Sequence, residues 1–209
     1  MRNSLVHKSS KPDYSDEVWW SRNFAAEYQA TSLVKDKGLM GSYKRLSRWQ
    51  APTNGFYKVN CCAISDIGSY RVGIGIVIRD GSGQVMASCC QFLEAAFDSH
   101  VAAIMAIFRG MLFSKDCGLI PGVLESDNTV AMERVLDNNF LNASFCTILY
   151  EIADLRSQLM GMKIIATTSC VNRVAIRLAK LALETLTSTV WMGDYPVGLR
   201  DLIDADMPS

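Results

Sequence analysis

The sequence predicts an α/β fold in which a five-stranded mixed sheet, in the order βββαβααβα, carries helices on both faces. Three strand-like runs follow one another with short connections, which is typical of an antiparallel meander. The later runs alternate between helical and extended patterns, so the last strands return through helices and pair in parallel. All of these runs lie after residue 49.

The first three strands are predicted from their composition and from the turns between them. The candidates are Phe56 to Ala63, Arg71 to Arg79 and Gln84 to Phe92. The run Asp80-Gly81-Ser82-Gly83 separates the last two, and these residue types favour tight turns. No helix start follows Gly73-x-Gly75, which therefore indicates a strand feature and not a phosphate-binding loop.

The remaining elements are predicted from apolar spacing and from residues that can cap helices. Helical patterns run from about Ser99 to Ser114, from Asp127 to Leu136 after a capping Ser126, from about Ser144 to Met160, and onward from a capping Asn172. The intervening strands are Val123 to Glu125 and Lys163 to Thr168.

We divide the chain into three segments. Residues 1–48 hold an amphipathic helical pattern from Trp19 to Leu33 and a linker from Lys35 to Arg48, residues 49–186 form the main domain, and residues 187–209 are a C-terminal tail. The Trp19-Trp20 pair is interpreted as an apolar anchor of that helix rather than a platform for stacking bases.

Composition indicates a globular, intracellular protein of the nucleus or cytoplasm. Apolar residues make up 49% of the 209 residues and charged residues 20%, which excludes a disordered chain. No apolar run is long enough to span a membrane, and the N-terminus lacks the apolar core of a secretion signal. The seven cysteines include two adjacent pairs, a pattern that suits reduced thiols.

Charge is zero overall but unevenly distributed. Residues 1–50 hold nine Lys or Arg against five Asp or Glu, and residues 51–209 hold twelve against sixteen. Proteins that bind nucleic acid strongly and without specificity usually carry a basic surface. The main domain lacks that excess, which argues against strong nonspecific binding.

Five motifs in register carry a family resemblance. They are Trp49-Gln50-Ala51-Pro52 with Lys58-Val59-Asn60, Gly73-Ile74-Gly75-Ile76-Val77-Ile78-Arg79-Asp80, Glu125-Ser126-Asp127, Asn172-Arg173-Val174-Ala175 with Leu178-Ala179-Lys180, and an ending with Trp191, Pro196, Leu199 and Asp206. From Trp49 to about Asp206 the chain resembles a plant ribonuclease H-like domain of the reverse-transcriptase-like type related to non-LTR retroelements. The resemblance implies the RNase H-like fold.

For active members, the resemblance implies cleavage of the RNA strand of RNA–DNA hybrids with Mg²⁺. Such chemistry uses two divalent ions, one activating water and one stabilising the leaving oxygen. Mg²⁺ prefers carboxylate oxygens. The family accordingly gathers four acids, on the first strand, the first helix, the end of the fourth strand and the last helix.

Only one of these four acids is present here. Asp127 occupies the position after the fourth strand, whereas Cys62, Ala103 and Ile176 occupy the other three. The catalytic accessory residues of the family, a mobile histidine and a nearby arginine, align with Ala166 and Ser169. One carboxylate cannot hold two dications in oxygen cages, so we expect no metal site and no cofactor.

Other acids are poor substitutes for the missing ones. Asp80 is expected to lie about 20 Å from Cys62, since the second strand runs back along the first. Asp66 lies in a connecting loop, while Glu94 and Asp98 precede the first helix and would point away from its middle.

Two interpretations of Asp127 remain open, as a residual metal ligand or as a first-turn acid that the helix dipole favours. A soft-metal site made of Cys62, Asp127 and His100 has little support, since no zinc-ligand spacing occurs.

Three hypotheses follow. In the first, the chain is a non-catalytic RNase H-like module, a pseudoenzyme that binds nucleic acid such as RNA–DNA hybrid weakly, or serves as an interaction module. In the second, it is an active ribonuclease H whose site is assembled in another way. In the third, it is a decaying retroelement fragment. Family membership alone supports the enzyme, and the missing acids favour the first hypothesis.

Overall fold

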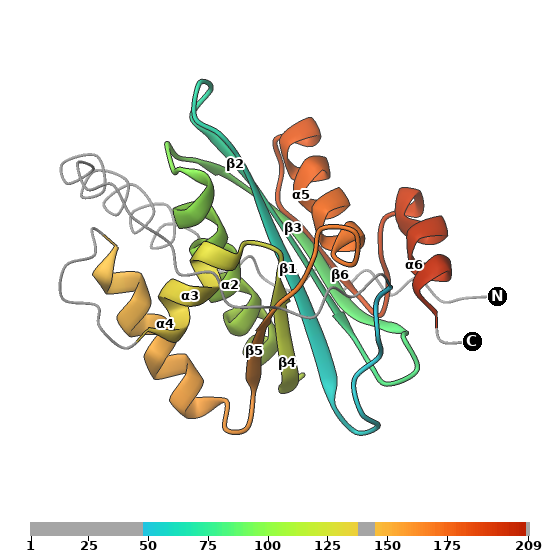
Figure 1. Cartoon of the computed structure of the whole chain (residues 1–209). Helices are drawn as coiled ribbons and strands as arrows, with labels where there is room; N and C mark the ends of the chain where they lie inside the picture. Colours follow the sequence, from blue (N-terminus) through green and yellow to red (C-terminus); the bar gives the residue numbers. More distant parts are fainter. Residues whose placement is uncertain (1–47, 138–144, 208–209) are drawn as a thin grey trace.

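The structure, a computed structural model, describes residues 48–137 and 145–207. They form an α/β fold with one mixed sheet and helices on both of its faces (Figure 1). The strands are β1 (Tyr57–Asp66), β2 (Arg71–Arg79), β3 (Val85–Glu94), β4 (Pro121–Ser126), β5 (Lys163–Ala166) and β6 (Thr189–Met192). The helices are α2 (Ser99–Asp116), α3 (Thr129–Leu136), α4 (Cys146–Gln158), α5 (Arg173–Thr185), the short 3₁₀ helix η1 (Val197–Leu199) and α6 (Arg200–Asp206).

The sheet has the strand order β5-β4-β1-β2-β3-β6. Antiparallel pairing joins β1 to β2, β2 to β3 and β3 to β6, while β1–β4 and β4–β5 are parallel. The predicted meander and its helical crossovers are therefore confirmed. All five predicted strands are present, and β2 has the predicted bounds.

The sheet has a sixth strand that the sequence analysis did not predict. β6 lies in the segment expected to be a tail and pairs with β3, with Val190 opposite Cys89. Beyond it, α6 packs near α5 on one face of the sheet (Figure 1). The prediction of five strands therefore omitted one strand, which lies next to β3 at the edge of the sheet.

Helices α2, α3 and α4 cover one face of the sheet, and α5 and α6 cover the other (Figure 1). β2 shows how the strands serve both layers, because side chains alternate between the faces of a strand. Its residues Ile74 and Ile76 belong to the core under α2, whereas Gly73 and Gly75 face α5. The adjacent cysteines Cys61 and Cys62 likewise point to opposite faces, as predicted.

The predicted start of α3 is wrong by two residues. Ser126 is the last residue of β4, where it pairs with Cys61 and Ala166. The cap is Asn128, whose side chain accepts a hydrogen bond from the Ala131 amide at 2.9 Å. Asp127 therefore precedes the cap and is not a first-turn acid, because sheet pairing holds Ser126 in extended conformation.

The predicted N-terminal helix and most of the linker after it lie outside the described residues. The division of the chain into three segments remains a prediction.

Candidate functional site

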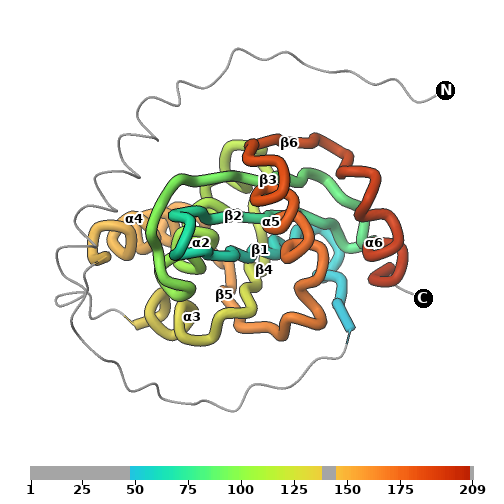
Figure 2. The backbone as a smooth tube through the Cα atoms, turned by 90° about the horizontal axis from the view of Figure 1, so that it is seen from above, coloured from blue at the N-terminus to red at the C-terminus, as the bar shows by residue number. Residues whose placement is uncertain are grey.

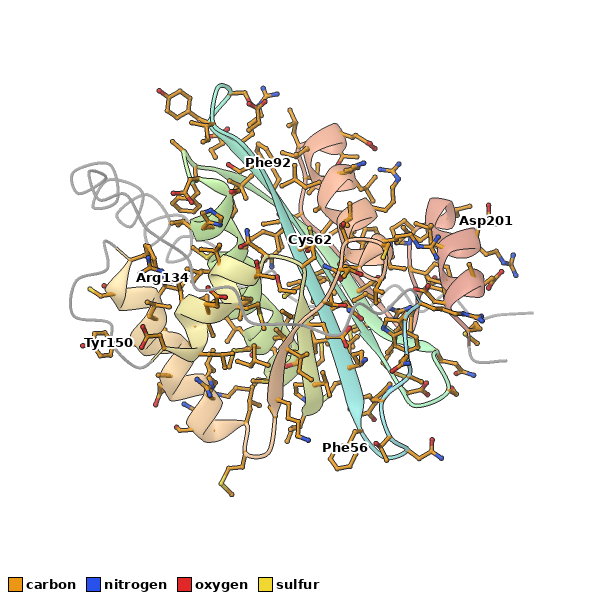
Figure 3. The ribbon with its side chains drawn as sticks, viewed as in Figure 1. Phe56, Cys62, Phe92, Arg134, Tyr150 and Asp201 are labelled. Carbon is orange, nitrogen blue, oxygen red and sulfur yellow. The ribbon has the colours of Figure 1, made fainter. Side chains whose placement is uncertain are left out.

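Three elements meet where the family gathers its acids. β1 and β4 are parallel neighbours, and Cys61 is paired with Ser126. The next residue of each segment, Cys62 in β1 and Asp127 after β4, therefore lie close together. The start of α5 completes the site with Asn172. Figure 3 labels Cys62, a residue of β1, near the centre of the molecule.

The carboxylate of Asp127 is engaged by protein groups. Asn172 Nδ2 donates to Asp127 Oδ1 at 2.9 Å and to the Cys61 carbonyl at 3.0 Å. These two acceptors fix the orientation of the Asn172 amide, which is 1% exposed. Asn172 occupies the cap position of α5 as predicted, but its side chain makes no capping hydrogen bond, because it ties β1 and the end of β4 together instead.

The second contact to Asp127 is the thiol of Cys62. Burial raises the pKa of Cys62 well above its ordinary range, and the charge of Asp127 and a hydrogen bond to it raise it further. The nearby ammonium of Lys180 lowers this pKa by a smaller amount. The thiol is therefore protonated at neutral pH, and it lies beside the carboxylate with its Sγ 3.7 Å from the Ala63 carbonyl oxygen.

The other two positions carry hydrocarbon side chains. Ala103 is buried in the core between α2 and the sheet, and Ile176 lies half-buried in the first turn of α5. Neither side chain has an oxygen or nitrogen donor. At the two accessory positions, Ala166 ends β5 and Ser169 is exposed in the loop before α5.

These residues do not fit a pair of magnesium ions. Mg²⁺ requires near-octahedral oxygen coordination. Here one carboxylate and the Asn172 amide oxygen, which has no hydrogen-bond partner among the described residues, stand beside a protonated thiol, a methyl group and an isoleucine, too few oxygens for two such ions. Among the residues of 48–137 and 145–207, no group of three or more His, Cys, Asp or Glu side chains could hold a metal ion. His100 forms no such group with Cys62 and Asp127, and its Nδ1 lies 3.2 Å from Asn128 Oδ1.

The acids considered as substitutes have other contacts. Asp80 follows Arg79, which pairs with Lys58, four residues before Cys62, so Asp80 lies well along the strand pair from Cys62. The Asp80 carboxylate accepts hydrogen bonds from the Ser82 and Gln84 amides and so stabilises the turn. Asp66 was expected in a loop but is the last residue of β1, opposite Arg71, and its carboxylate accepts a hydrogen bond from Ser69. Asp98 caps α2, and Glu94 ends β3.

A buried polar network, which the sequence analysis missed, uses the motif residues. Lys58 Nζ donates to Glu125 Oε1 at 2.6 Å, and Asn60 Nδ2 donates to Glu125 Oε2 at 2.9 Å. Asn60 Oδ1 in turn accepts from Trp49 Nε1 at 2.8 Å and from Arg79 at 3.2 Å. The Lys-x-Asn and Glu-Ser-Asp motifs thus join β1 to β4 by buried charge pairing.

The network continues to the C-terminal helix. Arg79 Nη1 donates to Asp206 Oδ2 at 2.9 Å, and Arg173 Nη2 donates to Asp206 Oδ1 at 3.2 Å. The Arg79 guanidinium also lies over the Trp49 ring, 3.7 Å from its centre. Polar residues at alternate strand positions were the available sequence signal for this network.

The strand order and the crossovers are those of an RNase H-like fold. The sequence matches the family described as reverse transcriptase-like over residues 65–182, more than half of the chain. The chain belongs to this reverse transcriptase-like family, and the predicted recognition is confirmed. No curated protein sequence matches it.

Solved structures agree on the fold. RNase H1 from Halobacterium salinarum NRC-1 is similar with a TM-score of 0.56 and 17% identity, covering 63% of this chain and 99% of that one. LC11-RNase H1 in complex with RNA/DNA hybrid gives 0.53 and 14%, covering 62% and 98%. The foamy viral protease-reverse transcriptase in complex with RNA/DNA hybrid gives 0.50 and 15%, covering 73% and 22%.

In the described part of the chain, every helix is too short or too polar to cross a bilayer.

Proposed function

We propose that the chain is a non-catalytic RNase H-like module that binds RNA–DNA hybrid weakly and does not cut it. The observation that carries the proposal is that the Asp127 carboxylate already has partners within the protein. It is the single carboxylate at the family's metal position, and an amide and a protonated thiol already bind it. We take a pseudoenzyme descended from a plant, retroelement-related ribonuclease, acting inside the cell, as part of the same proposal.

Cations beside the site support binding. Arg173, Arg177 and Lys180 follow one another along the same side of α5, at spacings that place them on one helix face. Arg173 pairs with Asp206 and Arg177 with Glu184. Lys180 is exposed and close enough to Cys62 to affect its pKa. A phosphate backbone passing over Asp127 would meet this ammonium.

Two solved relatives supply the ligand class. LC11-RNase H1 and the foamy viral protease-reverse transcriptase were both solved with RNA/DNA hybrid. Because phosphate contacts supply most nonspecific affinity, and this surface carries few cations, we expect weak and strongly salt-dependent binding.

The test is fluorescence anisotropy of a labelled hybrid duplex in EDTA at low salt. We expect Lys180→Glu to weaken binding about tenfold, since each phosphate contact contributes to affinity and charge reversal adds repulsion. Lys163→Glu is the matched control, because Lys163 is also exposed but lies on β5, at the sheet edge. An absence of binding at low salt, or equal loss in both variants, contradicts the proposed interface.

The same duplex tests the alternative, an active ribonuclease H. Incubation with Mg²⁺ or Mn²⁺ should leave the RNA strand intact. Cleavage that disappears in Asp127→Asn would establish the enzyme and overturn the proposal.

A further inference from the structure

β6 is an edge strand with one side open. Figure 2 shows it at the end of the row of strands, outside β3. The Gly193 amide donates to the Met86 carbonyl, and the register continues with Ser88 opposite Trp191 and Cys90 opposite Thr189. In an antiparallel pair, hydrogen-bonded positions alternate. The N–H and C=O groups of Val190 and Met192 therefore point away from β3.

Within the described residues the outward backbone groups of this edge have no partner, although the Met192 side chain lies against the end of α2, with its Sδ 3.8 Å from Cys117 Sγ. No hydrogen bond to the backbone groups of Val190 or Met192 is present there, and their side chains are 50% and 60% exposed. Proteins usually protect sheet edges with charged residues, proline or bulges. The strand Thr-Val-Trp-Met has none of these, whereas β5, at the opposite edge, begins with the exposed Lys163.

The open edge is complementary to itself. Two antiparallel copies of β6 related by a two-fold axis at Trp191 would place Val190 of each copy opposite Met192 of the other. Both positions have outward N–H and C=O groups, so each of these two facing pairs would exchange two hydrogen bonds. We propose that β6 pairs with β6 of a second copy of this chain, joining the two sheets into one continuous sheet.

The side chains favour a second copy over an unrelated strand. Val190 lies opposite Cys89 and Met192 opposite Ala87, both of which face the α2 layer, so the two apolar side chains would meet across the axis on that face. Trp191 lies on the other face and would meet its own equivalent, about 4.5 Å away between Cα atoms. Residues 187–193 carry no charge, so the two copies do not repel each other there.

The contact is small, and the dimer should accordingly be weak. Stable complexes usually bury about 1,200–2,000 Å² of total surface, more than a four-residue strand pair can supply. Association should therefore appear only with rising concentration.

Sedimentation of the full chain from about 5 to about 500 µM measures this association. We expect reversible dimerisation, and a dissociation constant raised at least about tenfold by Val190→Lys. Val197→Lys is the matched control, because Val197 is 94% exposed and lies in η1. A monomer at every concentration, or equal weakening in both variants, would overturn the proposal.

Val190→Pro is a sharper variant, since the amide it removes points away from β3 and the β3–β6 pairing remains. It should also prevent the dimer, and a dimer that persists in this variant overturns the assignment to β6.

Amide exchange followed by NMR tests the unmutated chain. With rising concentration, the amides of Val190 and Met192 should exchange more slowly, while that of Trp191, already bonded to β3, should change little. Slowing at another surface with no change at these two amides would contradict the proposal, and would point to a different occupant or interface.

Discussion

Two glycines in β2 set how closely α5 lies on the sheet. A Cβ atom built at Gly75 would lie 2.0 Å from the Ala175 carbonyl oxygen and 2.5 Å from the Ala179 amide nitrogen. Backbone atoms cannot yield as a flexible side chain does, so the helix itself would have to move. The Gly73-x-Gly75 pattern is thus a strand feature, as predicted, and the structure adds its role in close packing against α5.

Gly75→Ala should lower the free energy of unfolding by about 3 kcal/mol or more, because overpacking here acts on backbone. Urea unfolding measures the change. Gly198→Ala is the control, since a Cβ there meets nothing within 4 Å, and it should change stability by less than about 0.5 kcal/mol. Equal effects of the two substitutions would contradict the close α5 contact.

The buried thiol of Cys62 predicts a specific pH dependence. Its pKa is raised in the folded protein, first by burial and then by Asp127, so from about pH 9 upward the unfolded chain releases a proton that the folded chain retains. The stability contributed by the protonated thiol is therefore complete below that pH and is lost as pH rises.

Urea unfolding between about pH 9 and 10.5 compares the unmutated protein with Cys62→Ala. The slope of the unfolding free energy against pH should be less negative in the variant by up to about 1.4 kcal/mol per pH unit. Titrating groups that do not interact with Cys62 are common to both proteins and cancel in the difference, whereas Cys61 cancels only in part, because Cys62 contributes to its raised pKa. Identical slopes would show that the pKa of the Cys62 thiol is the same in the folded and the unfolded protein.

At the scale of elements, a buried carboxylate connects the C-terminal helix α6 to β2, beside the apolar contacts of Leu199 and Ile203. Asp206 is 2% exposed and pairs with Arg79, which is 1% exposed. Burial lowers the pKa of Arg79, an effect that its bond to Asp206 opposes. Removing Asp206 would leave a guanidinium buried without its carboxylate.

Asp206→Ala should destabilise the protein by about 3–5 kcal/mol, the usual result of breaking a buried pair. Asp204→Ala, in the same helix, removes an exposed carboxylate 3.9 Å from Arg200 and should change stability by about 0.5 kcal/mol or less. Thermal and urea unfolding of the two variants make the comparison. A small effect of Asp206→Ala would mean that α6 is not held through Arg79.

Elements stabilised by interactions between residues close in sequence were predicted well, and elements that depend on distant residues were not. β2 and the turn after it have local signals, in β-branched residues and Asp-Gly, and were predicted closely. The start of α3 was not, since pairing of Ser126 with residues 61 and 166 overrode its capping preference. β6 was missed because it is stabilised by β3, about a hundred positions earlier in the chain.

The candidate site was predictable in residue identity but not in contacts. Motif register led to Asp127, Cys62, Ala103 and Ile176, which are properties of the sequence alone. The amide of Asn172 on Asp127 joins residues 45 positions apart, and the Lys58–Glu125 pair joins residues 67 apart. Such contacts depend on the folded sheet, so spacing in the sequence could not reveal them.

For the whole molecule, we propose that this RNase H-like domain lacks a metal site. Three of the four acid positions carry Cys62, Ala103 and Ile176, and the remaining Asp127 is bound by Asn172 and Cys62. Replacing clustered carboxylates with uncharged side chains also removes their mutual repulsion, so we expect the fold to need no cation for its stability.

The most direct measurement is the melting temperature in EDTA and in Mg²⁺. An ion that binds the folded state must stabilise it. Because we expect no ion to bind, the melting temperature of the unmutated protein should differ by less than about 1 °C between EDTA and Mg²⁺. The variant combining Cys62→Asp, Ala103→Glu and Ile176→Asp restores the four acids and should melt several degrees higher in Mg²⁺ than in EDTA. A rise of several degrees in the unmutated protein would contradict the account.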